Sequence, residues 1–324
     1  MTKLLITGAN GFIGKALCAA LMADSNDAGH YRINAVVRTA AACPDAVVPI
    51  VLGDINANTD WTEALKAVDV VVHLAARVHV MHDEVAEPLA EFRKANVDGT
   101  MNLARQAAQA GVRRFVFISS IKVNGEYTRP GCPFTAEDTP APVDPYAVSK
   151  YEAEQALREL AGKNAMELVI IRPPLVYGPG VKANFYSMMR RLDKQMPLPL
   201  GAIDNRRSLL ALDNLVDLII ICIGHPAAAK QIFLAGDGED MSTTQLLHRV
   251  AAALGKTALL MPVPVWILTA VAKLFNKTAA FQRLCCSLQV DIGKTQRLLE
   301  WIPPVSVDEA LAKTAQDYMK NRRC

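Results

Sequence analysis

Residues 3–14 read KLLITGANGFIG, and this stretch decides the fold. Its first five residues are apolar and partly β-branched, which predicts a short buried strand, and residues 11–24 then carry apolar side chains at helical spacing. Three glycines, spaced three residues apart, punctuate the turn between the two: Gly8, Gly11 and Gly14. Glycine lets the backbone turn tightly and approach a pyrophosphate, whose charge is met by free N–H groups at the start of the helix. We therefore expect this unit to bind a dinucleotide.

Strand-like and helix-like segments alternate through the first half of the chain. Strands are predicted at 3–7, 33–37, 47–52, 69–74, 114–119 and 166–171, and helices at 11–24, 60–67, 88–110 and 145–163. Further helices are predicted at 183–195, 213–223, 242–254, 264–275 and 307–320. The alternation predicts an α/β fold with a doubly wound parallel (Rossmann) sheet. We expect a dinucleotide-binding domain at 1–177 and, over most of 178–324, a smaller C-terminal substrate-binding lobe.

A second motif, YAVSK, spans residues 146–150. Tyr146 and Lys150 are four residues apart, so on a helix they share one face. An ammonium beside a phenol favours the phenolate, which would lower a tyrosine pKa that is ordinarily near 10. The predicted strand at 114–119 ends next to Ser120, and open α/β sheets bind ligands at the carboxyl ends of their strands. A dinucleotide-binding turn followed along the chain by a hydroxyl, a proton donor and a cation indicates hydride transfer.

The end of the second predicted strand bears on which dinucleotide binds. NAD sites commonly have an acid there, about 20 residues after the glycine turn, but residues 33–37 are followed by Arg38. A guanidinium suits the 2′-phosphate of NADP, so Arg38 favours NADP and leaves NAD open, because a strand-end arginine can also be a solvated surface residue. Asp54, after the third strand, could accept a hydrogen bond from the adenine amino group.

With these motifs the chain resembles the extended short-chain dehydrogenase/reductases of the nucleotide-sugar epimerase, dehydratase and reductase group, over nearly its whole length. The landmarks that carry the resemblance, besides the two motifs above, are Asp54-Ile55, His73-Leu74-Ala75-Ala76, Asn96, Ser119-Ser120, the stretch RPPLVYGPG at 172–180, Arg207 ahead of SLLALD, and Lys294 seven residues before Trp301. In this family part of the C-terminal region returns to the main sheet, and two helices of the main domain often form a homodimer, for which 88–110 and 145–163 are the candidates.

The resemblance implies roles for individual residues. The catalytic residues would be Ser120, which holds the reacting sugar oxygen, Tyr146, which transfers a proton, and Lys150, which binds the nicotinamide ribose. The dinucleotide would contact Gly8, Asn10, Gly11, Phe12, Ile13, Gly14, Arg38, Asp54, Ile55, Leu74, Ala75, Ala76, Asn96, Ser119, Tyr146, Lys150, Pro173 and Val176. The substrate would be a nucleotide-diphosphate sugar, UDP-linked, contacted by Ser120, Lys122, Asn124, Asn184, Arg207 and Arg283. Arginine suits a diphosphate because its planar fork makes paired hydrogen bonds.

The residues after Ser120 separate the reactions of this group. Dehydratases have Asp and Glu there to eliminate water, whereas this chain has Ile121 and Lys122, so elimination is disfavoured. The stretches 121–126 and 287–291 resemble reductases that form UDP-N-acetylquinovosamine in bacterial O-antigen pathways. With Arg38, they favour a UDP-4-keto-6-deoxy-N-acetylhexosamine reductase.

Two other readings stay open. A UDP-sugar 4-epimerase with tightly bound NAD is the alternative, since the site and the hydride chemistry are shared. A non-catalytic dinucleotide-binding module is disfavoured, because such relatives typically lose the tyrosine or the lysine and both are present here.

Composition limits the other possibilities. The chain has 324 residues, of which 51% are hydrophobic and 21% charged, and its net charge of +3 gives no extended nucleic-acid surface. Seven cysteines without a C-x-x-C pair lead us to expect a reducing cytoplasm, and no metal site is expected. The longest apolar stretch, 261–275, is interrupted by two prolines and a lysine and is too short to span a bilayer. A packed amphipathic helix is expected there, with membrane association or a subunit contact left open.

Overall fold

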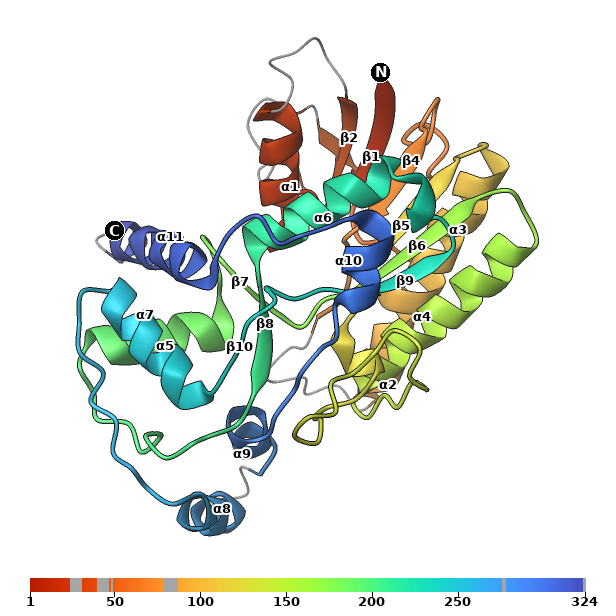
Figure 1. The fold of residues 1–324 in the computed structure, drawn as a ribbon. Coiled ribbons are helices and arrows are strands. Elements are labelled where there is room, and N and C mark those ends of the chain that lie inside the picture. The colour runs from red at the N-terminus through yellow and green to blue at the C-terminus, as the bar shows by residue number, and fades with distance from the viewer. Residues whose placement is uncertain (24–30, 40–46, 48, 79–86, 276–277, 323–324) are drawn as a thin grey trace.

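A computed structural model describes residues 1–23, 31–39, 47, 49–78, 87–275 and 278–322 (Figure 1). The side chains of residues 278–280 and 283 also lie outside the description, as do residues 24 and 48, which the sequence assigns to a helix and a strand. Seven described strands form one parallel sheet: β1 (Thr2–Thr7), β2 (Tyr31–Val37), β3 (Pro49–Val51), β4 (Val70–His73), β5 (Arg114–Ile118), β6 (Glu167–Arg172) and β9 (Gln231–Leu234). Their order, β3-β2-β1-β4-β5-β6-β9, confirms the doubly wound α/β fold.

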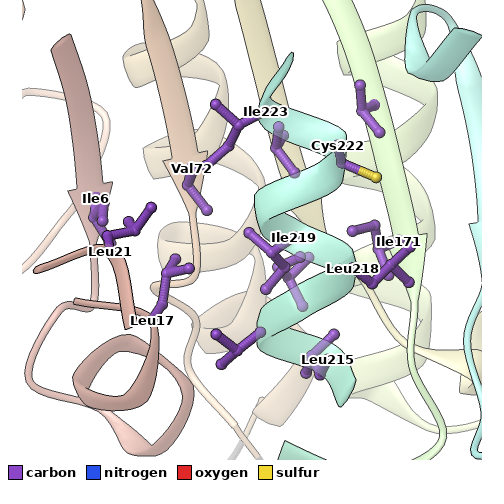
Figure 2. Close-up of a cluster of buried hydrophobic side chains, with 14 of the residues drawn as sticks. Ile6, Leu17, Leu21, Val72, Ile171, Leu215, Leu218, Ile219, Cys222 and Ile223 are labelled. Atoms are coloured by element: carbon purple, nitrogen blue, oxygen red, sulfur yellow. The ribbon is translucent and has the colours of Figure 1, made fainter. Parts of the chain in front are cut away.

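Alternating side chains of the strands supply the two faces of this sheet. On one face, α1 (Phe12–Ala23) and α6 (Leu212–Gly224) bury their apolar stripes; Figure 2 shows Leu17 and Leu21 of α1 beside Ile6 of β1, and Ile219 of α6 between Val72 and Ile171. On the other face, α3 (Thr100–Gln109) and α4 (Pro145–Gly162) pack against the intervening strand residues. The sheet is therefore covered on both sides, and its strand ends are left to form a site.

The segment predicted as one helix at 88–110 contains three. It begins as α2 (Pro88–Arg93), continues as a π-helical stretch, η3 (Lys94–Gly99), and ends as α3. A π turn holds more residues than an α turn and is frequent at functional sites. Asn96 lies inside η3 and is 1% exposed.

The helix predicted at 60–67 is wrong, because these residues form turns. The carboxylate of Asp60 accepts hydrogen bonds from both the backbone N–H, at 2.9 Å, and the hydroxyl, at 2.6 Å, of Thr62, and such local bonds compete with helix formation. Trp61 and Leu65 are four residues apart, which resembles helical spacing, but they are apolar because both are buried in the core on the α3 and α4 side of the sheet.

Most of the remaining elements lie beside the sheet (Figure 1). The segment around Leu299 and Trp301 is an exception, because both side chains are buried in the main core with residues of α1 and α6. Three strands make a small sheet in the order β10-β8-β7: β7 (Leu175–Tyr177), β8 (Arg207–Ala211) and β10 (Asp240–Met241). The remaining helices are α5 (Ala183–Asp193), α7 (Thr243–Ala253), α8 (Val265–Leu274), α9 (Thr278–Cys285), α10 (Gly293–Leu299) and α11 (Val307–Asn321), with short 3₁₀ turns η4 (Ile121–Val123) and η5 (Pro226–Ala228). A separate apolar core joins α5, α7 and α11. Within the described ranges, no helix has the length and apolar character needed to cross a membrane.

Candidate functional site

The glycine turn after β1 is built around close backbone approaches. Gly8 has φ +68°, and a Cβ added there would lie 2.9 Å from the backbone nitrogen of Ala75. A Cβ on Gly14 would lie 2.2 Å from the carbonyl oxygen of Gly8. Both positions therefore require glycine. Next to them, the side chains of Phe12 and Ile13 are half-buried against the core, so the start of α1 is fixed beside the turn. Asn10 is also half-buried, and Gly11 is exposed.

A buried histidine ties the turn to the end of β4. One ring nitrogen of His73, Nδ1, lies 2.7 Å from the hydroxyl of Thr7, and the other, Nε2, lies 2.9 Å from the hydroxyl of Thr100. The Thr7 hydroxyl also accepts a hydrogen bond from the backbone N–H of Ala75 at 3.1 Å. Burial, followed by the charge of Lys150, lowers the pKa of His73 to about 3, so the ring is neutral. This network aligns Leu74, Ala75 and Ala76 with the glycine turn, and the sequence alone shows only its landmark histidine.

Asn96 links the loop after β4 to the helix that carries the YAVSK motif. Its carbonyl oxygen accepts the backbone N–H of Arg77 at 2.8 Å, and its amide donates to the carbonyl of Arg77 and the hydroxyl of Ser149, both at 3.0 Å. The Ser149 hydroxyl in turn donates to the carbonyl of Tyr146 at 2.7 Å. Asn96 thus holds the loop and the motif helix together. Ile55 reaches the same region, since a Cβ added at Gly99 in η3 would lie 2.8 Å from it.

Asp144 caps α4 two residues before Tyr146. Its carboxylate accepts the backbone N–H of Ala147 at 2.7 Å, and the Tyr146 ring packs edge-on against Phe92 with centroids 6.0 Å apart. Burial, together with the charge of Asp144, raises the pKa of Tyr146 to about 12. The expectation that Lys150 lowers this pKa is therefore wrong for the protein alone.

The reason lies in the surroundings of Lys150. Its side chain is 2% exposed, and its ammonium lies over the Phe117 ring, 3.9 Å from the centroid. Burial lowers the pKa of Lys150 to about 7, although the charge of Glu154 opposes the shift. At neutral pH this lysine is therefore only partly charged, and it offers the phenol of Tyr146 little of the positive charge that the motif suggests.

Two serines stand at the carboxyl end of β5. Ser120 caps η4, where its hydroxyl accepts the backbone N–H of Lys122 at 3.3 Å, and its side chain is half-buried. The hydroxyl of Ser119 is buried without a hydrogen-bond partner among the described residues. A buried hydroxyl normally has a partner. The glycine-lined turn and this unpaired hydroxyl both fit the dinucleotide that the sequence predicts.

Lys122 and Asn124 both contact protein groups. The ammonium of Lys122 pairs with Glu126 at 3.1 Å and with Asp144. The amide of Asn124 accepts from Arg172 at 2.9 Å and donates to the carbonyl of Thr135 at 2.8 Å, and it is 2% exposed. Sequence reasoning assigned both residues to the sugar. The structure places Asn124 in a buried network beneath the site.

That network continues to a buried ion pair. The guanidinium of Arg172 makes two hydrogen bonds to the carboxylate of Glu154, one of 2.9 Å and one of 2.5 Å, and both side chains are 2% exposed. No motif in the sequence singles out Glu154, which lies one helical turn after Lys150. The pair fixes α4 against the end of β6 and so sets the position of the motif helix.

The other residues assigned from the sequence lie around this centre. Pro173, after β6, accepts the backbone N–H of Ile121 through its carbonyl at 3.0 Å, and Val176 in β7 is partly buried against the core. Arg38 and Asp54, after β2 and β3, form an ion pair of 2.9 Å with side chains 73% and 79% exposed.

The three residues assigned to the substrate lobe are spread over three elements. Arg207 at the start of β8 is half-buried and donates to the carbonyl of Cys286 at 3.0 Å, and burial lowers its pKa. Asn184 is exposed in the first turn of α5. Arg283 belongs to α9, but its side chain lies outside the described part of the chain. Of the three, Arg207 is the one whose side chain is both described and half-buried.

Residues 4–236 match the NAD dependent epimerase/dehydratase family. The chain is 50% identical over 319 residues to a UDP-glucose 4-epimerase of Vibrio cholerae, covering 98% of this chain and 96% of that protein. It is 27% identical to the N-acetyl-alpha-D-glucosaminyl-diphospho-ditrans,octacis-undecaprenol 4-epimerase of Escherichia coli O157:H7, covering 97% of this chain and 94% of that protein.

Solved structures share the fold. A UDP-glucuronic acid 4-epimerase of Bacillus cereus, in complex with NAD, superposes with a TM-score of 0.79 at 21% identity, covering 99% of this chain and 98% of that one. A UDP-glucose 4-epimerase of Thermotoga maritima, with UDP-glucose, gives a TM-score of 0.77 at 22% identity, covering 99% and 100%. These likenesses agree with the resemblance drawn from the motifs. By the match over residues 4–236 and the identity shared with the Vibrio cholerae protein, the chain belongs to the NAD dependent epimerase/dehydratase family.

Proposed function

We propose that this protein is a UDP-sugar 4-epimerase that works with bound NAD. The observation that carries the proposal is the Vibrio cholerae relative, a UDP-glucose 4-epimerase with 50% identity over 98% of this chain. The sequence alone favours a UDP-4-keto-sugar reductase, and this relative moves the epimerase alternative ahead of it.

Three residues would divide the work at carbon 4 of the sugar. The hydroxyl of Ser120, at the carboxyl end of β5, would hold the carbon-4 oxygen, and Tyr146 would take and return the proton of that oxygen. Lys150 would hold the nicotinamide ribose. When bound, NAD would supply a hydride acceptor and donor and a positively charged ring.

The pKa values indicate how Tyr146 and Lys150 cooperate. A phenol with a pKa near 12 stays protonated at neutral pH, whereas an amine with a pKa near 7 is present in both its neutral and its charged form. A phenolate formed on Tyr146 would raise the proton affinity of Lys150, because an anion nearby favours the charged amine. We infer that a neutral Lys150 takes up a proton as Tyr146 loses one, so this buried pair of side chains gains no net charge.

The ion pair between Arg38 and Asp54 supports NAD over NADP. The guanidinium, which alone would attract a 2′-phosphate, lies 2.9 Å from a carboxylate that repels one. The pair is exposed and neutral overall, so it offers the 2′ position little net charge. Arg207, half-buried at the start of β8, would contact the diphosphate.

A reductase remains the second candidate, because no acid follows β2 and Arg38 stands there instead. Isotope tracing separates the two. An epimerase given UDP-glucose deuterated at carbon 4 forms UDP-galactose that keeps the deuterium, without consuming added NADPH. A reductase instead consumes 4-deuterated NADPH with a UDP-4-keto sugar and moves the deuterium to carbon 4. If neither substrate turns over while NAD binds, the proposed activity is wrong.

A further inference from the structure

The helices α8 and α9 expose an unusual amount of apolar surface. Of the 19 large hydrophobic side chains that are exposed in the described chain, eight come from residues 259–284. They define the α8–α9 patch: Leu259, Met261, Val265, Trp266, Val271, Leu274, Phe275 and Leu284. The helix predicted at 264–275 is present as α8, but within it only Ala272 is buried, so the close packing expected for 261–275 is largely missing. Figure 1 shows α8 and α9 at the edge of the molecule, away from the seven-stranded sheet.

Hydrogen bonds to backbone groups hold this patch in place at both ends. At one end, Leu198 donates its N–H to the carbonyl of Leu259 at 2.9 Å, and Met261 donates to the carbonyl of Leu198 at 2.8 Å. At the other end, the amide of Asn205 donates to the carbonyl of Leu284 at 3.1 Å and to that of Cys286 at 3.0 Å. The patch is therefore a positioned surface of the fold. A large exposed apolar patch of this kind marks an interaction site.

The charge around the patch indicates what it binds. From Met241 to Val290 the sequence has five basic residues and no acidic one, whereas the rest of the chain has 30 basic and 32 acidic residues. Among the described side chains, Arg249 pairs with Glu239, while neither Lys256 nor Lys273 forms an ion pair with a described carboxylate. The patch thus combines tryptophan, phenylalanine and leucine with two lysines nearby in the sequence that have no carboxylate partner within the described ranges.

That combination fits one class of partner. Interfacial helices insert tryptophan, phenylalanine and leucine at the headgroup boundary, and basic residues nearby attract anionic lipids. A second copy of the chain would bring the same cations against these and would supply no acid from this segment to pair with them. We propose that the α8–α9 patch binds the surface of an anionic lipid bilayer, with Trp266, Leu274 and Phe275 entering the interface. This inference is independent of the proposed epimerase activity.

The tryptophans allow a direct test. Trp61 and Trp301 are 0% and 1% exposed, whereas Trp266 is 72% exposed, so a blue shift of tryptophan emission on lipid binding reports Trp266 alone. The full chain is titrated with vesicles of phosphatidylcholine containing about a third phosphatidylglycerol, and with vesicles of phosphatidylcholine only. We expect flotation with the anionic vesicles, a blue shift, and weaker binding in high salt. Trp266→Phe should bind as well as the wild type but show no shift.

Two further variants test the groups that carry the proposal. Trp266→Ser combined with Leu274→Ser and Phe275→Ser should abolish flotation, while Ile302→Ser, a matched change at a side chain 77% exposed elsewhere, should leave it intact. Lys256→Gln and Lys273→Gln should each weaken binding about fivefold. All these side chains are exposed, and circular dichroism checks that the variants fold.

Three outcomes would overturn the proposal. One is a folded wild type that floats with neither kind of vesicle. Another is equal flotation of the wild type and the triple serine variant. The third is a protein that ignores vesicles and dimerises in a concentration-dependent way that the triple serine variant abolishes, because the patch would then be covered by a second copy.

Discussion

The ammonium of Lys150 lies 3.9 Å from the centroid of the Phe117 ring, in a position where only 2% of the lysine is exposed. An aromatic face recovers part of the charge stabilisation that water would give, but burial still lowers the pKa of Lys150 to about 7. Burying this amine therefore lowers the free energy of unfolding, although the amine is needed for the proposed activity. We expect a substitution of Lys150 to lower activity and raise stability.

Lys150→Met should lower turnover by at least about 100-fold and weaken cofactor binding, yet raise the free energy of unfolding by about 1–3 kcal/mol. Between pH 7 and the ordinary lysine value of 10.5, the unfolded chain binds a proton that the folded chain lacks, so this residue makes wild-type stability rise with pH. Urea unfolding without cofactor, at several pH values, measures both effects. A variant with wild-type pH dependence would contradict the assignment.

Tyr146→Phe should reduce kcat by about 10²–10⁴-fold while leaving NAD affinity nearly unchanged, because only the transferable proton is lost. Single-turnover kinetics and cofactor titration measure the two separately. Tyr151→Phe, on the same helix, is the matched control and should keep full activity. Activity retained in the Tyr146 variant would remove this phenol from the mechanism.

Asp144→Asn should move the pH dependence of kcat toward lower pH. The charge of Asp144 is one of the two causes that raise the pKa of Tyr146, and burial is the larger. Asparagine remains a good helix cap, so α4 should still begin in place. Asp138→Asn removes a charge that caps a turn at Thr135, and it should leave the profile unmoved. Identical profiles for wild type and Asp144→Asn would refute the coupling.

Asp54→Asn should raise the affinity for NADP relative to NAD by several-fold, because it frees the guanidinium of Arg38 from its carboxylate partner. Arg38→Ala should shift the ratio the other way. Equilibrium titration with both dinucleotides gives the ratio for each variant. If the ratio is the same in all three proteins, the pair lies outside the cofactor site.

The features that depend on local backbone chemistry could be predicted from the sequence. Gly8 and Gly14 are needed because any side chain would strike neighbouring backbone, and the alternation of strands and helices follows from side-chain periodicity. The strand at residues 114–118 could also be predicted, because a strand that is buried along its whole length shows a mostly apolar run in the sequence.

The electrostatics of the site could not be read from spacing. The distance of four residues between Tyr146 and Lys150 is real, but the pKa values follow from burial and from Phe117, Asp144 and Glu154, which come from other segments or other turns. The family resemblance implies that Asn124 contacts the substrate, whereas Arg172 holds its amide from a strand about 50 residues away. Tertiary partners of this kind leave no local pattern.

The wide turn at Lys94–Gly99 has a consequence for natural and engineered variation. Deleting one residue there would allow a regular α-helix from Pro88 to Gln109. Judged by helix propensity alone, this deletion would be neutral or stabilising. Each residue of a helix advances its phase by about 100°, however, so the deletion would swing Asn96 away from Arg77 and Ser149. Length variants of this helix should therefore uncouple fold from activity: they would remain folded proteins whose YAVSK helix has lost its anchor.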